Sequence, residues 1–329
     1  MLDALKVESE RLARSWMQHE SAKLREYLVA GVEDPRINLQ SILSRHFLVR
    51  SVFGDKFREQ MEHECRFAAV MNWFTAFAAN SDPEELAAVF HALQLGADDA
   101  EGIQIPRFIL NTFRPLPVSL GPLEIPNYIE TILTESVALN TFQSLWFQTL
   151  AGEAPPSPPL TVFEPACGSA NDYRFLDSFG IARFLQYTGL DLCCKNIENA
   201  RALFPRACFA RGNVFEINAQ DDGFDLSFVH DLFEHLSIVG LHAAVKEICR
   251  VTRCAICANF FQMDEISEHV VRPTEEYHWN LLSMDQIKKL FANHGFSGQI
   301  IQIKSFLRQE FGCDNTHNPN AYTLIVHRA

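Results

Sequence analysis

A run of small residues follows the first strongly apolar strand of the C-terminal half. In the segment VFEPACGSANDY (162–173), the small residues Ala166, Gly168 and Ala170 occupy alternate positions. Small side chains where a strand passes into a helix leave backbone N–H groups open to a ligand. The pattern favours a nucleotide-like ligand, although a tight turn without any ligand can have the same short signature.

Polar residues end the next two apolar strands. Asp191 closes FLQYTGLD (184–191), where an acid can accept hydrogen bonds from ribose hydroxyls. Asn213 follows ACFAR (207–211), and its amide oxygen could accept from an adenine amino group while Val214 and Phe215 pack on the base. Each residue alone is a weak signal, because strand-end acids and turn asparagines are common. Their order along the chain makes the combination stronger.

His230 and Asp231 follow the fourth strand, FDLSFVH (224–230), at the mouth where the reacting group of a ligand would lie. A histidine titrates near neutral pH, so His230 is a candidate general base or cofactor-wall residue. A loop histidine that only packs beside the ligand is an equal alternative. His235, at the start of the next helix, is predicted to serve packing.

The loop Val271–Asn280 brings several chemically useful side chains together. It contains Tyr277 and His278, which are candidate catalytic residues, and also Arg272 and Trp279. We expect this loop to border an acceptor pocket. The alternative for each single residue is a surface loop anchored by Trp279.

The elements that must position these residues alternate between strand and helix from Leu160 onward. Apolar strand-length runs alternate with helical stretches, which predicts a doubly wound, mostly parallel sheet with helices on both faces. Such sheets bind ligands at the carboxyl ends of their strands. The last two strand candidates, 299–307 and 321–328, have no helical pattern between them and suit an antiparallel pair at the sheet edge.

The N-terminal half is predicted to be helical. One helix is indicated by SDPEELAAVFHALQLG (81–96), with Ser81 as N-cap, Glu84 closing a capping box and Gly96 beyond the end. A second is indicated from Asn127, with Glu130 at the reciprocal capping position. The Pro-rich connector 151–160 predicts a boundary between a helical domain, 1–154, and an α/β domain, 155–329. The helical domain would serve as a lid, a substrate-binding part or a dimer surface.

Together these motifs resemble the class I S-adenosylmethionine-dependent methyltransferases. The family's first motif, ribose acid, third-strand residue and fourth-strand segment are matched by Glu164 with Ala166, Gly168 and Ala170, by Asp191, by Gly212 with Asn213, and by FDLSFVHDLFEHL. The sequence departs from the family where Ala166 and Ala170 replace glycines and Asn213 replaces an acid. A nicotinamide dinucleotide fold is a weaker match, because its fingerprint requires glycine at the first, third and sixth positions.

The resemblance implies a seven-stranded Rossmann-like domain that uses S-adenosylmethionine, releases S-adenosylhomocysteine and transfers the methyl group in line to a small-molecule acceptor. The cofactor-binding residues expected from it are Glu164, Ala166, Gly168, Ala170, Asn171, Tyr173, Asp191, Leu192, Asn213, Val214, Phe215 and His230. The expected catalytic residues are His230, Tyr277 and His278. Two alternatives stay open, namely a protein methyltransferase and a non-catalytic cofactor-binding protein.

The amino-acid composition limits the classes of partner that the protein is expected to bind. The 329 residues carry a net charge of -13, which disfavours nucleic acid as a substrate. No apolar run is long enough to span a membrane, and we expect a cytoplasmic protein that dimerises through its N-terminal helices. The nine cysteines are expected to stay reduced. The pair in CAIC (254–257) would face opposite sides of a strand, so no metal site is predicted.

Overall fold

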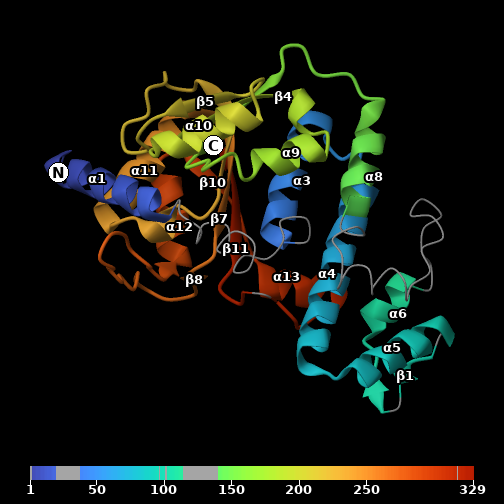
Figure 1. The fold of residues 1–329 in the computed structure, drawn as a ribbon. Helices are drawn as coiled ribbons and strands as arrows, with labels where there is room; N and C mark the ends of the chain where they lie inside the picture. The colour runs from blue at the N-terminus through green and yellow to red at the C-terminus, as the bar shows by residue number, and fades with distance from the viewer. Residues whose placement is uncertain (1, 20–37, 96, 101, 114–139, 317) are drawn as a thin grey trace.

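The protein is described here from a computed structural model, which describes residues 2–19, 38–95, 97–100, 102–113, 140–316 and 318–329. A seven-stranded sheet with the order β10-β11-β7-β6-β3-β4-β5 forms the centre of the C-terminal half (Figure 1). Its strands are β3 (Leu160–Pro165), β4 (Leu185–Asp191), β5 (Cys208–Arg211), β6 (Phe224–Val229), β7 (Thr252–Phe260), β10 (Phe296–Gln302) and β11 (Tyr322–Arg328). Neighbouring strands from β5 to β7 are parallel, whereas β11 is antiparallel to both β7 and β10. The predicted doubly wound, mostly parallel sheet is confirmed.

Helices alternate with these strands, as the sequence predicted. They are α9 (Tyr173–Ser178), α10 (Cys194–Leu203), α11 (Ile238–Val251), α12 (Met284–Asn293) and α13 (Ile303–Phe311), with 3-10 turns η2 (Ala182–Phe184) and η3 (Phe233–His235) and a short parallel pair, β8 (Met263–Asp264) and β9 (Leu282–Ser283). Ser283 is the N-cap of α12, since its hydroxyl accepts a hydrogen bond from the Gln286 amide.

The prediction of a single strand over 299–307 is wrong. Strand β10 ends at Gln302, and α13 (Ile303–Phe311) replaces the second half of the predicted strand and continues into the interval that was expected to lack a helix. The physical reason is the spacing of Ile303 and Leu307, which are four residues apart, both buried, and therefore lie on one helix face. The antiparallel pairing of β10 with β11 is confirmed, but only β10 lies at the sheet edge.

The N-terminal half is helical apart from one short hairpin. Its elements are α1 (Leu2–His19), α3 (Leu39–Phe53), α4 (Arg58–Asn80), α5 (Pro83–Leu95), α6 (Arg107–Phe113), α8 (Asn140–Ala151) and the pair β1 (Asp99–Ala100) and β2 (Ile103–Gln104).

The helix predicted over 81–96 is present, but its capping box is displaced by one residue. The Asp82 carboxylate accepts hydrogen bonds from the amides of Glu84 and Glu85, and Glu85 accepts in return from the Asp82 amide. An aspartate caps a helix as well as a serine does, so Asp82 replaces the predicted Ser81. Gly96, Asn127 and Glu130 lie outside the described residues.

Both faces of the sheet are buried, and the alternation along each strand assigns side chains to one face or the other. Val162 and Cys257 pack in a cluster with α3, α4 and α8, whereas Phe163 and Ile256 pack in a second cluster with α11 and α12. Helix α1 contributes Leu12 to the second cluster and contacts α11 (Figure 1).

The N-terminal helices are bound directly to the sheet. The Gln40 side-chain amide, in the first turn of α3, donates to the carbonyls of Phe260 and Tyr322 at the ends of β7 and β11. The first cluster continues from α3 and α4 into the sheet without interruption. The first turn of α3 therefore lies at the edge of the sheet where a ligand would bind. The boundary between 154 and 155 stays a prediction.

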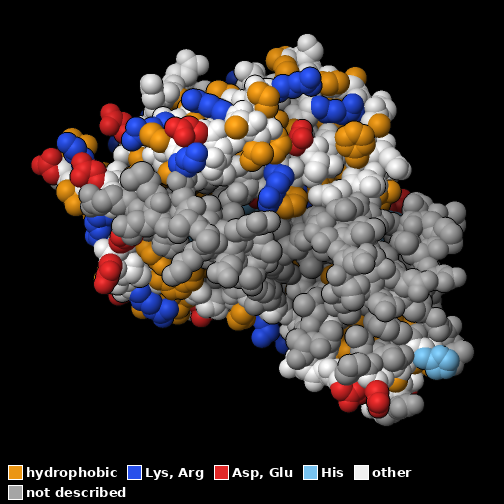
Figure 2. Space-filling model, viewed as in Figure 1, with side chains coloured by type: hydrophobic (Ala, Val, Ile, Leu, Met, Phe, Trp, Pro, Cys, Tyr) orange, Lys and Arg blue, Asp and Glu red, His pale blue; other side chains and the backbone are white. Residues whose placement is uncertain are grey.

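The charged surface residues and the cysteines add little to the location of the site. Figure 2 shows Lys and Arg side chains interspersed with Asp and Glu over the described part of one face. All nine cysteines are free, and in the CAIC segment Cys254 is exposed while Cys257 is buried, as expected for opposite faces of a strand. None of the described helices is long and apolar enough to cross a membrane.

Candidate functional site

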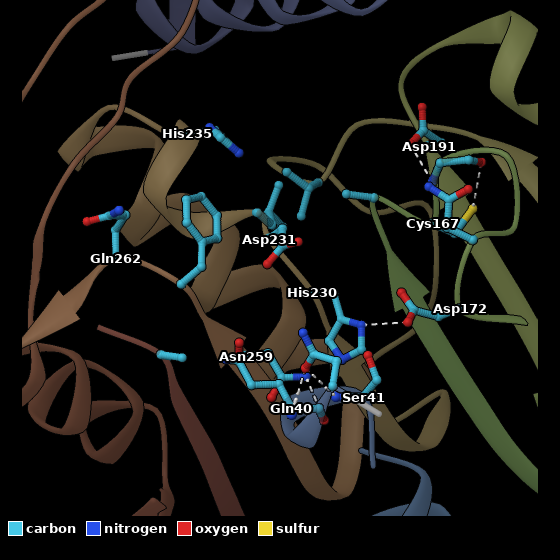
Figure 3. Close-up of a pocket in the computed structure, with 18 of the residues that line it drawn as sticks. Gln40, Ser41, Cys167, Asp172, Asp191, His230, Asp231, His235, Asn259 and Gln262 are labelled. Atoms are coloured by element: carbon cyan, nitrogen blue, oxygen red, sulfur yellow. Dashed lines mark hydrogen bonds and ion pairs between the residues drawn. The ribbon is translucent and has the colours of Figure 1, made fainter. Parts of the chain in front are cut away.

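A cavity of about 520 Å³ lies at the carboxyl ends of β3, β4, β5 and β6, which is within the usual size range of a small-molecule site. Both halves of the chain line it (Figure 3). The predicted residues that line it are Ala166, Gly168, Asn171, Asp191, Leu192, Asn213, Val214, Phe215 and His230. Of the other predicted residues, Glu164, Ala170, Tyr173, Tyr277 and His278 do not line this cavity. The roles of all these residues stay predictions.

The small-residue turn has an unusual backbone. Ala166, Gly168 and Ala170 all have left-handed backbone conformations, with φ of 58°, 55° and 67°. Glycine adopts this conformation without strain, whereas an alanine Cβ makes it unfavourable by roughly 1–2 kcal/mol. The two alanines therefore adopt the conformation that glycine would favour. Ala166 lines the cavity, while the methyl group of Ala170 is buried beneath it.

Asp191 connects the end of β4 to this turn. Its carboxylate accepts hydrogen bonds from the backbone amides of Gly168 at 3.0 Å and Cys193 at 2.8 Å, and from the Asn196 side chain at 3.2 Å. Burial raises the pKa of Asp191, although these three donors oppose the shift. Since a carboxylate has about four acceptor positions, about one is left for a ligand hydroxyl.

Apolar side chains enclose one end of the cavity. Leu192, Val214 and Phe215 line it from the sheet side, and Leu12 of α1 lines it from the N-terminal half. Both groups of the Asn213 amide already have partners within the chain, because the nitrogen donates to the Ser9 hydroxyl and the oxygen accepts from the Phe215 amide. Asn213 thus ties α1 to the loop after β5.

His230 is held between two other side chains, one from each half of the chain. Its Nδ1 lies 2.7 Å from the Asp172 carboxylate, and its Nε2 lies 2.9 Å from the Ser44 hydroxyl of α3. Burial alone would lower the pKa of His230, but the charge and hydrogen bond of Asp172 raise it above its ordinary value. Both ring nitrogens are occupied, so His230 forms part of the cavity wall with no nitrogen directed at a ligand (Figure 3).

Glu164 lies beneath this pair. Its carboxyl group accepts a 2.5 Å hydrogen bond from the Tyr187 hydroxyl and is hydrogen-bonded to Asp172. Burial and the neighbouring Asp172 charge raise the pKa of Glu164 well above its usual range. The ring of Tyr173 packs against Tyr187 in the same buried layer. Glu164 and Tyr173 therefore support the turn from below.

Three more titratable residues, Asp231, Glu234 and His235, follow His230 in the chain after β6. Loss of hydration raises the pKa of Asp231, which lies inside the cavity, to about 6 and that of the buried Glu234 to about 8, and it lowers the pKa of His235 to about 4. Glu234 accepts hydrogen bonds from the amides of Phe261 and Gln262. Asp231 and His235 line the cavity, so His235 contacts the cavity as well as packing against its neighbours.

The loop Val271–Asn280 contributes one residue to the cavity, Trp279. The rings of Tyr277 and Trp279 both pack against His235. The backbone amide of His278 donates to the His235 carbonyl, and burial lowers the pKa of His278. Tyr277 and His278 therefore lie behind the wall formed by His235 and Trp279.

The remaining wall consists of residues that the sequence analysis did not find. It includes amides and hydroxyls from the first turn of α3, from the carboxyl end of β7 and from the segment before β11, together with apolar residues of α13, namely Gln40, Ser41, Asn259, Gln262, Ile303, Leu307, Thr316 and Asn318. The α3 residues are remote in sequence from every motif, and no local pattern indicates them. Asp172 could have been noticed, because it directly follows Asn171 in the small-residue turn.

Metal binding finds no support in the part of the chain that the structure describes, where no group of three or more His, Cys, Asp or Glu residues could hold an ion.

Comparisons with known proteins agree with this geometry. Residues 163–254 match the family model described as a methyltransferase domain, a span that includes the turn, Asp191 and His230. A comparison with curated proteins found no match.

Many solved structures are similar to part of this chain at low sequence identity. A SAM-dependent methyltransferase from Methanosarcina mazei is 12% identical, with 52% of this chain and 92% of that chain covered and a TM-score of 0.39. The 1,6-didemethyltoxoflavin-N1-methyltransferase of Burkholderia thailandensis is 12% identical, with 62% and 86% covered and a TM-score of 0.40. Magnesium protoporphyrin IX methyltransferase from Synechocystis is 15% identical, with 57% and 79% covered and a TM-score of 0.37.

Proposed function

Because the C-terminal half of this chain is a class I S-adenosylmethionine-dependent methyltransferase domain, we propose that the protein transfers a methyl group from this cofactor to a small-molecule acceptor. The observation that carries the proposal is the position of the cavity. It lies at the carboxyl ends of β3 to β6, inside the span that matches the methyltransferase family, and it extends beyond that span into the N-terminal half.

The residues on the sheet side of the cavity suit the cofactor. Asp191 offers an acceptor for a ribose hydroxyl, and the left-handed turn at Gly168 brings the backbone close to the ligand. Leu12, Val214 and Phe215 supply an apolar enclosure for a base. We assign the adenosine part of the cofactor to this end, and the acceptor to the wall formed by Gln40, Ser41, Asn259, Ile303 and Asn318.

The cofactor supplies an activated methyl group on a sulfonium, so the chain itself has mainly to align the acceptor for in-line displacement. The first turn of α3 does this from one side and Trp279 from the other. His230, held by Asp172 and Ser44, gives a rigid wall between the two ligands. The N-terminal helices shield the reaction from water, in agreement with the role of a lid.

Titration calorimetry with S-adenosylhomocysteine tests the proposal. We expect one site per chain, and Asp191→Ala should weaken binding by about 1–3 kcal/mol through the lost ribose hydrogen bond. Asp191→Asn, which keeps one acceptor oxygen, separates this loss from damage to the turn. Asp177→Ala, at an exposed position of α9, is the control and should bind like the wild type. Absence of binding by the wild-type protein would refute the proposal.

Transfer itself is tested with S-adenosylmethionine labelled in the methyl group and a panel of small acceptors. Labelled product would exclude a non-catalytic binding protein, and binding without any transfer would favour it. Transfer to a protein fraction alone would favour a protein methyltransferase.

The remaining assignments are also proposals. The net charge of -13 supports a small molecule over nucleic acid as acceptor, and we place the protein in the cytoplasm. We further propose a helical domain over 1–154 that forms a homodimer. The exposed apolar side chains of Val7 on α1 and Phe147 on α8 support such an interface. Light scattering during gel filtration would give the mass that tests it.

A further inference from the structure

We propose that Asp231 is the catalytic base of the methyl transfer, and that the acceptor presents a hydroxyl or amine whose proton must be removed. This inference rests on the proposed function, and it replaces His230 as the candidate base. It is carried by the position of the Asp231 carboxylate in the cavity and by the protein hydrogen bonds that already engage the neighbouring acids Asp172, Asp191 and Glu234.

The neighbouring carboxyl groups are already committed to the fold. Asp172 is paired with His230, and Asp191 accepts three hydrogen bonds. Glu234 accepts two backbone amides with Oε1, and its Oε2 has no partner among the described residues, but Glu234 does not line the cavity. In contrast, no hydrogen bond from any described residue reaches the Asp231 carboxylate, although the side chain lines the cavity and is exposed to it. Figure 3 shows Asp231 between the His230–Asp172 pair and His235, with no dashed line joining it to another side chain.

His230 is a poor base in this arrangement for a geometric reason. A general base must lie within hydrogen-bonding distance of the proton that it removes. The two ring nitrogens of His230 face Asp172 and Ser44, at 2.7 Å and 2.9 Å, so neither is directed at a ligand in the cavity. Asp231, the next residue in the chain, provides an accessible proton acceptor instead.

The backbone at Asp231 has a conformation that is strained for any residue other than glycine. Its φ is 46°, in the left-handed region that costs a non-glycine residue roughly 1–3 kcal/mol. Such strain is concentrated at functional sites, where it fixes the direction of a side chain. Here it directs the Asp231 side chain toward the cavity. The side chain of the adjacent His230 points in a different direction.

The electrostatic surroundings suit a base that works near neutral pH. Partial loss of hydration inside the cavity raises the pKa of Asp231 to about 6, His230 opposes this shift, and Asp172 adds to it. Glu234, the other acid near Asp231, has a pKa of about 8 because of burial and the Asp231 charge, and is therefore protonated at neutral pH. His235 is neutral there, since burial lowers its pKa to about 4. Among the described residues, the charges that act on the pKa of Asp231 are those of His230 and Asp172.

The chemical step balances without a further reactant. A lone pair on the acceptor oxygen or nitrogen forms the new bond to the methyl carbon, and the carbon–sulfur bond breaks with its electrons left on sulfur. The proton of the acceptor passes to an Asp231 oxygen and later to water. A carboxylate acceptor has no proton to lose, and it would be repelled by Asp172 and Asp231. The acceptor is therefore neutral or cationic.

The experiment compares the wild type with Asp231→Asn and with Asp177→Asn, an exposed control on α9. Calorimetry with S-adenosylhomocysteine comes first, because failure of the wild type to bind would refute the proposed function itself. Rates of transfer to phenol, catechol, benzylamine, benzoate and thiophenol are then measured against pH. Phenol and catechol test the hydroxyl, and benzylamine tests the amine. Thiophenol, which ionises by itself, needs no base.

We expect transfer to a hydroxyl or amine acceptor, with a rate that falls by about 100-fold or more in Asp231→Asn while S-adenosylhomocysteine affinity stays within about twofold. The kcat/KM of the wild type should rise as the pH passes through about 6, and the kcat/KM of Asp231→Asn should not show this rise. Any thiophenol transfer should be equal in both proteins. Independently of turnover, carbon-13 NMR of labelled aspartate should show one carboxyl that titrates near pH 6 and is absent from Asp231→Asn.

Three results would overturn the inference. The first is equal transfer by Asp231→Asn and the wild type. The second is cofactor binding without transfer to any hydroxyl or amine of the panel. The third is an NMR titration that Asp231→Asn leaves unchanged.

Discussion

Replacing Ala166 by glycine should stabilise the protein, because this alanine has a φ of 58°. Release from the left-handed conformation gains roughly 1–2 kcal/mol, and the greater freedom of glycine in the unfolded chain costs about 0.4–1 kcal/mol. The Ala166 side chain is exposed to the cavity, so its methyl group adds little to the balance. The expected net gain is therefore about 0.5–1 kcal/mol.

The second alanine of the turn gives an internal comparison. Ala170 has a φ of 67°, but its methyl group is buried, and removing it should cost about 0.8 kcal/mol more. Ala170→Gly is thus expected to be close to neutral. Ala202→Gly, at an exposed position in α10, is the control and should destabilise the protein by about 1 kcal/mol.

Urea unfolding followed by circular dichroism would measure all three variants. The expected order of stability is Ala166→Gly above the wild type, Ala170→Gly close to it and Ala202→Gly below it. The argument from backbone strain would be refuted if Ala166→Gly lost as much stability as Ala202→Gly.

Two further predictions concern buried acids. Glu64 lies in the helical core within 2.8 Å of the Arg45 guanidinium and 2.7 Å of the His46 ring, so Glu64→Gln should destabilise the protein by about 3–5 kcal/mol. Glu62→Gln, at an exposed ion pair, should change the urea midpoint little, and an equally small effect of Glu64→Gln would contradict the first expectation. The pKa of Glu234 in the folded protein, about 8, lies above its value in the unfolded chain. Between about pH 5 and 8 the folded state therefore binds a proton that the unfolded state has lost, and the stability of the wild type should fall as the pH rises through this range. Glu234→Gln should lose this slope in urea unfolding at the two pH values, and a slope equal to that of the wild type would show that Glu234 is not its source.

The sequence predicted which strand-end residues meet on the sheet side of the cavity, for a topological reason. Parallel strands place their carboxyl ends at one edge, so residues after successive strands, such as Gly168, Asp191 and His230, must come together. Local patterns were sufficient because each of these residues directly follows an apolar strand.

The other side of the site could not be predicted in this way. Gln40 and Ser44 approach the sheet only because α3 packs across β7 and β11, a contact between distant parts of the chain. Strand-end position also gave no indication that the nitrogens of His230 would be occupied by Asp172 and Ser44. Whether these nitrogens have partners depends on side-chain geometry. Because they do, we propose Asp231 as the base in place of His230.

A crystal structure of the complex with S-adenosylhomocysteine would show whether the cavity holds the cofactor. We expect the adenosine in the cavity, with a ribose hydroxyl at Asp191 and the base between Leu12, Val214 and Phe215. The sulfur should lie toward His230 and Asp231. A cofactor bound elsewhere, or a cavity still without cofactor at saturating concentration, would contradict it.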